Sequence, residues 1–235
     1  TVSFHSGTKA GAVRIEAVVV DSIGTAITPR VASETTQFMV YGGPAYMDMS
    51  NLNDPFTNSR MKLYTGPINI YANHIGSDEN KSTVTVTVAD RYNNPVPPGT
   101  AVYFTTTGGY ITNSTGYTDE NGMASVTLFS GNPFPTLLNS STIPNPNYGA
   151  SYPGSPQTFT MPQHDLDGNG QNNNGIAVVT ARTEGLDQNG KNVTVWNYTQ
   201  VIFSMPVAVF SIASSSYTLN LGQVANISIT IKDAN

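Results

Sequence analysis

The residues of this chain best suited to bind a ligand are clustered in the short segment 165–171, which reads Asp-Leu-Asp-Gly-Asn-Gly-Gln. Oxygen-bearing side chains recur there at every second position, and glycines between them allow the backbone to turn sharply. Carboxylate and amide oxygens are the ligands that Ca²⁺ prefers in proteins. The pattern therefore predicts a Ca²⁺ site formed by Asp165, Asp167, Asn169 and Gln171.

The start of this segment resembles the calcium loop of EF-hand and dockerin proteins. Those loops place a bidentate acid at their twelfth position, where this chain has Ile176. The site would need a further ligand, such as Glu184, Asp187 or water, and an affinity of order 10⁻⁴ to 10⁻³ M, as in extracellular modules. The alternative is a turn in which the Asp and Asn side chains bond their own backbone. The residues support the two interpretations about equally.

A calcium titration separates these two interpretations. If the site forms, we expect millimolar Ca²⁺ to raise the melting temperature, because an ion that binds only the folded state stabilises that state. Asp167→Ala should abolish the rise. Thermal unfolding followed by circular dichroism, with Ca²⁺ or with a chelator, measures both effects. If Ca²⁺ does not change the melting temperature of the wild-type protein, the Ca²⁺ site is ruled out and the turn is the remaining interpretation.

Composition and motifs exclude several other functions. The sequence contains no Gly-x-Ser-x-Gly elbow, phosphate-binding glycine loop or His-Glu-x-x-His motif, so we predict that it is not an enzyme. The absence of cysteine excludes disulfides and Cys-ligated metal sites. The net charge of −5 and the pI near 5.0 argue against nucleic-acid binding. No apolar run is long enough to cross a bilayer.

The segment 82–131 carries the clearest structural pattern. Residues 83–88 alternate strictly between threonine and valine, which predicts a half-buried strand with Val84, Val86 and Val88 on one face. Turn-forming residues in 90–99 end this strand, and further strands are predicted at 101–105 and 124–129. The last strand follows Asn-Gly, which is a strong hairpin signal.

Segments 83–109 and 118–131 resemble the bacterial Ig-like domain, group 1, of invasin-like and intimin-like surface proteins. They read TVTVTVADRYNNPVPPGTAVYFTTTGG and TDENGMASVTLFSG, with the strands and turns of that family in order. One part differs, because Asn93 precedes Asn94-Pro95 where the family often has glycine. The resemblance implies an immunoglobulin-like β-sandwich without catalytic residues, located outside the cell or on a bacterial surface.

Internal repeats predict more than one such domain. Three segments near the N-terminus recur later, first at an offset of 124 residues and then at 164 and 163. The difference, 164 − 124 = 40, places an insertion of about 40 residues between Gly131 and Gly175. The matched segments are 2–7 with 126–131, 11–17 with 175–181, and 36–40 with 199–203.

We therefore predict an all-β chain of tandem Ig-like β-sandwiches, one complete and two partial. Residues 1–43 would be the C-terminal strands of one domain, and 44–205 a complete domain with the long insertion at 132–174. Residues 206–235 would begin a further domain, because 225–233 repeat the alternation of 83–90. Neighbouring Ig-like domains of the same longer chain are then the expected partners.

The 132–174 insertion is rich in Pro, Asn, Ser and Gly and contains scattered aromatic residues. A connection of this length is usually functional or disordered. It could fold back over its own sandwich, fastened by its aromatic residues. It could instead contact a neighbouring subunit or another surface protein, or be disordered.

Three functions are consistent with these features. The first is a structural or adhesive extracellular protein acting as a cell-surface stalk or fibre. The second is a subunit of an ordered filament or sheath that packs through the 132–174 insertion. The third is an accessory module of a larger secreted enzyme or carbohydrate-binding protein. The first is favoured, because tandem sandwiches with stiff junctions are suited to hold a load.

Overall fold

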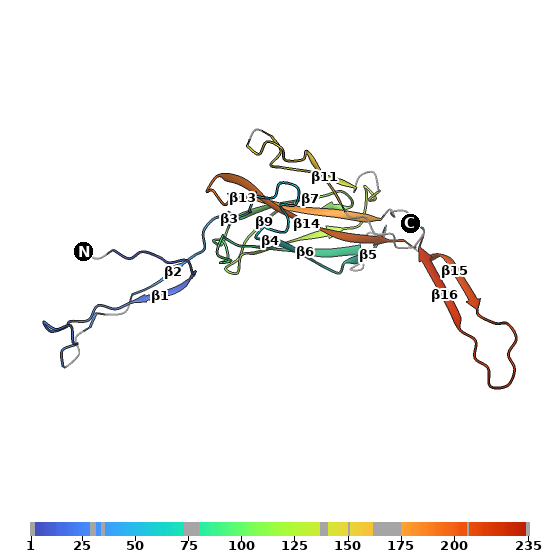
Figure 1. The fold of residues 1–235 in the computed structure, drawn as a ribbon, viewed down its shortest axis with the longest axis horizontal. Helices are drawn as coiled ribbons and strands as arrows, with labels where there is room; N and C mark the ends of the chain where they lie inside the picture. The colour runs from blue at the N-terminus through green and yellow to red at the C-terminus, as the bar shows by residue number, and fades with distance from the viewer. Residues whose placement is uncertain are drawn as a thin grey trace.

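The computed structural model describes residues 3–28, 32–33, 36–72, 80–136, 141–149, 151–161, 175–205 and 207–233. Its elements are all β-strands. Two sheets stack face to face in the middle of the molecule, and a two-stranded hairpin extends from each end of this sandwich (Figure 1). The prediction of an all-β, Ig-like sandwich is thus confirmed. The domain limits at 43/44 and 205/206 remain predictions.

The first sheet is antiparallel, with strand order β4-β6-β10-β8. Its central strand shows why the sequence alternates: Val84, Val86 and Val88 point into the core and are at most 1% exposed, whereas Thr83 faces solvent. The strands predicted at 83–88 and 124–129 are therefore confirmed. The four strands are β4 (Met61–Gly66), β6 (Lys81–Val88), β8 (Tyr110–Ile111) and β10 (Met123–Phe129).

The second sheet has the order β5-β14-β13-β7-β9, and β3 pairs in parallel with the end of β13. The strand predicted at 101–105 is confirmed within β7. Phe104 and Phe203 point from this sheet into the core, which they share with the valines of β6. The strands are β3 (Ala45–Tyr46), β5 (Asn69–Tyr71), β7 (Ala101–Thr106), β9 (Thr115–Tyr117), β13 (Ile176–Leu186) and β14 (Asn192–Ser204).

Several tight turns of the chain have the same five-residue sequence, Asp-x-x-Gly-x. In the turn after β13, Asp187 Oδ1 accepts the N–H groups of Asn189 and Lys191 at 2.8 Å each, and Gly190 has φ 75°. The Asp119 turn before β10 has the same bonds, to Asn121 at 2.9 Å and Met123 at 2.8 Å. The hairpin predicted there is wrong, because β9 pairs with β7 in one sheet and β10 pairs with β6 in the other. Aspartate stabilises the turn, and glycine supplies the positive φ that other residues rarely adopt.

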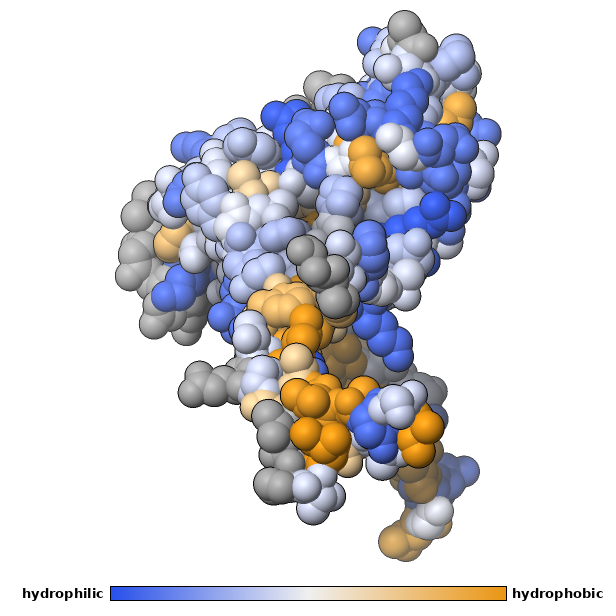
Figure 2. Space-filling model, turned by 90° about the vertical axis from the view of Figure 1, so that its left-hand side faces the viewer, coloured by the Kyte–Doolittle hydropathy of each residue, from blue (hydrophilic) through white to orange (hydrophobic). Residues whose placement is uncertain are grey.

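The two hairpins at the ends of the sandwich expose apolar side chains. They consist of β1 (Gly11–Ile15) with β2 (Thr36–Val40), and β15 (Val207–Ser214) with β16 (Ile227–Asp233). Figure 2, seen from the N-terminal side, shows a mainly polar surface over the sandwich and hydrophobic side chains gathered lower, at the height of the hairpins in Figure 1. Among the residues that the structure describes, the hairpins thus lack the second layer that buries the same kind of side chain in the sandwich.

Candidate functional site

The insertion 132–174 contributes a small separate sheet, β11 (Thr142–Pro144) with β12 (Thr158–Thr160). Ile143 and Phe159 are buried beneath it, at 2% and 6% exposure. Phe159 and Phe56 contact the indole of Trp196, with ring centroids 5.6 and 4.8 Å apart. The described parts of the insertion therefore fold back over the outer face of their own sandwich, fastened by aromatic side chains as the first interpretation predicts.

This cover explains the burial of Trp196, which is only 2% exposed. It also explains the run 176–179, in which four consecutive residues of β13 are buried instead of alternate ones. One face of β13 packs on the core between the sheets, and the insertion covers the other face. A strand buried on both sides reads as a continuous apolar run.

Polar contacts complete the attachment of the insertion. The amide of Asn147 donates to the carbonyl of Thr194 at 2.8 Å and accepts its N–H at 2.9 Å, as a neighbouring strand would. The hydroxyl of Tyr152 donates to Asp187 at 3.2 Å, and the ammonium of Lys191 lies 4.6 Å from the centre of the Tyr152 ring. Burial, together with the charge of Asp187, raises the pKa of Tyr152 to about 12.

The predicted Ca²⁺ ligands Asp165, Asp167, Asn169 and Gln171 lie outside the described residues, and the site remains a prediction. Asp187, suggested as a further ligand, is 4% exposed and accepts bonds from its own turn and from Tyr152. Within the described ranges, no three His, Asp or Glu side chains are grouped so that they could hold a metal ion.

A second candidate site lies at the junction between the N-terminal hairpin and the sandwich. Asp90, 4% exposed, follows β6, and its carboxylate accepts hydrogen bonds from four donor groups. Three come from its own turn: the N–H of Tyr92 at 2.8 Å, the N–H of Asn94 at 2.9 Å and the Asn94 side-chain amide at 3.0 Å. The fourth, at 2.9 Å, comes from the N–H of Gly43 in the linker that enters the sandwich.

Asn94 extends the same network to the far side of the linker. Its Nδ2 donates to the carbonyl of Thr8 at 2.7 Å, and its Oδ1 accepts the N–H of Ala10 at 3.0 Å. A side chain at Gly42 would lie 2.3 Å from the carbonyl oxygen of Pro95, so only glycine fits there without a shift of the backbone. The turn 90–95, which we name the junction turn, thus joins the sandwich, the linker and the loop before β1.

The electrostatics of the junction turn favour a charged Asp90. Burial alone would raise the pKa of this carboxyl, because a buried charge loses its hydration. The hydrogen bonds from Asn94, Gly43 and Tyr92 together outweigh burial and hold the pKa of Asp90 below its usual value. The carboxylate therefore stabilises the folded junction in its ionised form.

Sequence reasoning treated 90–99 only as a break between strands and missed this role. The sequence did contain a pattern that indicates this turn. Asp90 begins an Asp-x-x-Asn-x segment, which forms the same turn as the segments that begin at Asp119 and Asp187. Asn93 takes the place of glycine with φ 64°, and asparagine tolerates that conformation better than most residues.

Comparison with known proteins finds a family match within the central sandwich. Residues 62–136 match the family described as bacterial Ig-like domain (group 1). No curated protein matches the chain. The described part of the chain contains no helix with the length and hydropathy of a membrane span.

Two solved structures are similar to the chain. The first is the adhesin InvE of Yersinia pseudotuberculosis, with 22% identity and a TM-score of 0.36, over 74% of this chain and 35% of that one. The second is the D0-D1 domain of intimin, with 18% identity and a TM-score of 0.32, over 83% of this chain and 64% of that one. The chain thus spans less than two thirds of each structure. The chain is thus similar to the bacterial Ig-like domain (group 1) over residues 62–136.

Proposed function

We propose that this chain is part of a cell-surface stalk or fibre, a non-enzymatic extracellular protein in which Ig-like sandwiches follow one another. The observation that carries the proposal is a shared strand register. In the N-terminal hairpin, Ala12 pairs with Met39; in the sandwich, Ile176 pairs with Ile202. These pairs are related by the offsets of the sequence repeat, 164 and 163, so both hairpins form the same part of a domain.

The C-terminal hairpin gives the same kind of support. Ile212 pairs with Ile229 in β15–β16, as Leu63 pairs with Val86 in β4–β6. Val86 is fully buried, whereas Ile212 and Ile229 are both 59% exposed. An apolar face of this kind requires cover. We infer that strands of a neighbouring sandwich in a longer chain supply it, at both ends.

The junction turn supplies the mechanical element of a stalk. A stalk keeps its reach only if consecutive domains do not bend freely, and interfaces between domains are otherwise often mobile. Hydrogen bonds from the junction turn to the linker and to the preceding loop restrict such bending. A filament subunit packing through the insertion is less well supported, because the buried side chains Ile143 and Phe159 are already used within the sandwich.

Electron microscopy of the native protein tests the proposal. We expect negatively stained material released from the cell surface to show slender strings of beads. Antibodies against the sandwich should label intact cells with immunogold. Regular helical filaments whose subunits meet at the insertion would contradict the stalk, as would labelling found only in broken cells.

A further inference from the structure

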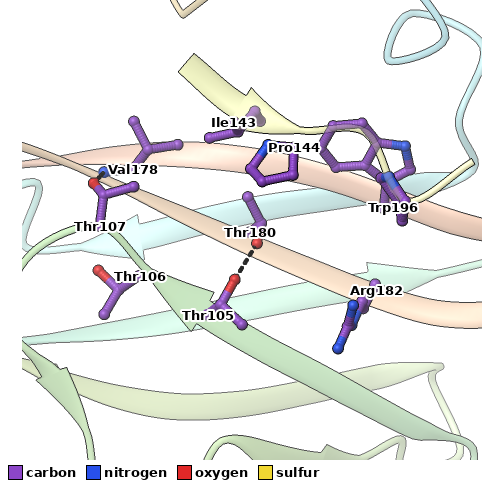
Figure 3. A pocket seen from close by; sticks show the side chains of 10 residues that line it. Thr105, Thr106, Thr107, Ile143, Pro144, Val178, Thr180, Arg182 and Trp196 are labelled. Carbon is purple, nitrogen blue, oxygen red and sulfur yellow. Dashed lines mark hydrogen bonds between the residues drawn. The ribbon is translucent and has the colours of Figure 1, made fainter. Parts of the chain in front are cut away.

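A groove runs between the insertion and the outer face of β13. Its first part has a volume of about 350 Å³ and lies between Ile143 and Pro144 on one side and the hydroxyls of Thr105 and Thr180 on the other (Figure 3). Two adjoining hollows, of about 320 and 250 Å³, continue it past Arg182 and Glu184. These volumes are in the range of ligand-binding clefts.

The three hollows form one continuous groove because they share lining residues. The first and second share Arg182, the second and third share Glu184 and Thr194, and the first and third share Pro146. Alternate residues of β13 from 178 to 184 form its floor, so it extends over roughly 20 Å at the rise of a strand. That length suits several units of a polymer better than one small molecule.

The chemistry of the lining is neutral and rich in hydroxyl groups. The hydroxyls of Thr105 and Thr180 bond each other at 2.6 Å, which leaves one O–H hydrogen and further lone pairs for a ligand. Arg182 and Glu184 contribute one charge of each sign, so the groove has no net charge to attract an ionic polymer. Charged groups of this kind can form strong hydrogen bonds with the hydroxyl groups of a ligand.

Two exposed aromatic rings lie along the groove. Tyr103, 47% exposed, comes from β7 and lines the second hollow; Tyr148, 57% exposed, comes from the insertion and lines the third. An aromatic face is electron-rich and attracts C–H groups that carry partial positive charge, as those of a sugar ring do. Hydroxyls, one charge of each sign and exposed tyrosines together form a surface suited to a carbohydrate.

A peptide is a poorer fit to this groove. Extended peptides gain affinity by adding a strand to a free sheet edge. The floor here is a sheet face, because Thr180 pairs with Thr105 on one side and with Tyr198 on the other. Only side chains are offered to the ligand, and most of them are neutral hydroxyls.

We propose that the groove between the insertion and β13 binds a neutral oligosaccharide. This goes beyond the role of a stalk, because it gives the shaft of the protein an adhesive site of its own. The insertion then has a function: it provides one wall of the groove while remaining attached to the sandwich by Asn147 and Phe159. Failure of this proposal would leave the stalk unaffected, since the two rest on different residues.

Titration with neutral hexasaccharides tests the proposal. Cellohexaose, mannohexaose and chitohexaose are added to the ¹⁵N-labelled chain, and amide shifts are followed by NMR. We expect at least one of them to bind and to shift the amides of Thr180, Arg182 and Thr194. Tyr103→Ala and Tyr148→Ala should each weaken binding at least about tenfold, as for aromatic anchors in other interfaces.

The matched control is Tyr117→Ala, which removes a tyrosine that is 66% exposed on β9 and does not line the groove. It should leave the affinity unchanged. All three tyrosines are exposed, so the variants should retain the wild-type melting temperature. The proposal is overturned if no neutral hexasaccharide binds, if only an acidic polymer such as heparin binds, or if the three variants lose affinity equally.

Discussion

Val86→Asp is expected to prevent the sandwich from folding at 25 °C or to lower its free energy of unfolding by at least about 4 kcal/mol. Val86 is fully buried in the middle strand of the first sheet, between Leu63 of β4 and Ala124 of β10. A carboxylate there would have no partner, and burying an unpaired charge costs several kcal/mol. Urea unfolding followed by circular dichroism measures the loss.

Two further variants of β6 make this result interpretable. Thr83→Asp places the same charge on the same strand, but on its exposed face, and should change the free energy of unfolding by less than about 0.5 kcal/mol. Val86→Ala leaves a cavity without a charge and should cost about 2 kcal/mol, so that a folded protein can be studied. Equal effects of the two aspartates would show that the core does not lie on the predicted face.

The strands of the sandwich were predictable because their causes are local. The period of two in 83–88 follows from burial on one face, and the tight turn before β10 follows from Asp119 and Gly122. The same locality made the repeats visible: Ala12 and Ile176 occupy matching places because both strands have apolar residues at corresponding positions. None of these features depends on segments far away in the chain.

The candidate sites were not predictable, because they depend on contacts between distant segments. The groove exists only because Ile143 of the insertion lies over Thr180 of β13. Neither segment carries a sequence pattern that indicates contact with the other. The junction turn is local, but its bond to Gly43 spans 47 positions, and its bonds to Thr8 and Ala10 span more than 80. The sequence predicted a turn at 90–95 but did not predict its hydrogen bonds to the linker and to the loop before β1.

Asp90→Ala is expected to lower the free energy of unfolding by about 3 kcal/mol, because several buried N–H donors would lose a charged acceptor. It should also loosen the junction, since one of these donors belongs to Gly43 of the linker. The chain has no native cysteine, so spin labels can be attached at Ile23→Cys and Tyr64→Cys, two exposed positions on either side of the junction. Their distance distribution, measured by pulsed electron paramagnetic resonance, should broaden in the variant.

Asp119→Ala is the matched control, because Asp119 forms the same kind of turn through Asn121 and Met123 on the exposed surface. It removes a turn-forming carboxylate but no linker contact, and should leave the distance distribution narrow. If both variants broaden it equally, or if neither does, the junction turn does not hold the linker.

The pH dependence of this effect follows from the sign of the pKa shift at Asp90. Its folded pKa lies below the unfolded value of about 3.9. The carboxylate's contribution is therefore fully present above about pH 4 and is lost as the pH falls through the folded pKa. The gap in stability between wild type and Asp90→Ala should accordingly be largest near neutral pH and shrink below about pH 4, when urea midpoints are compared. A gap that is constant down to about pH 2 would mean that Asp90 acts through its shape and not through its charge.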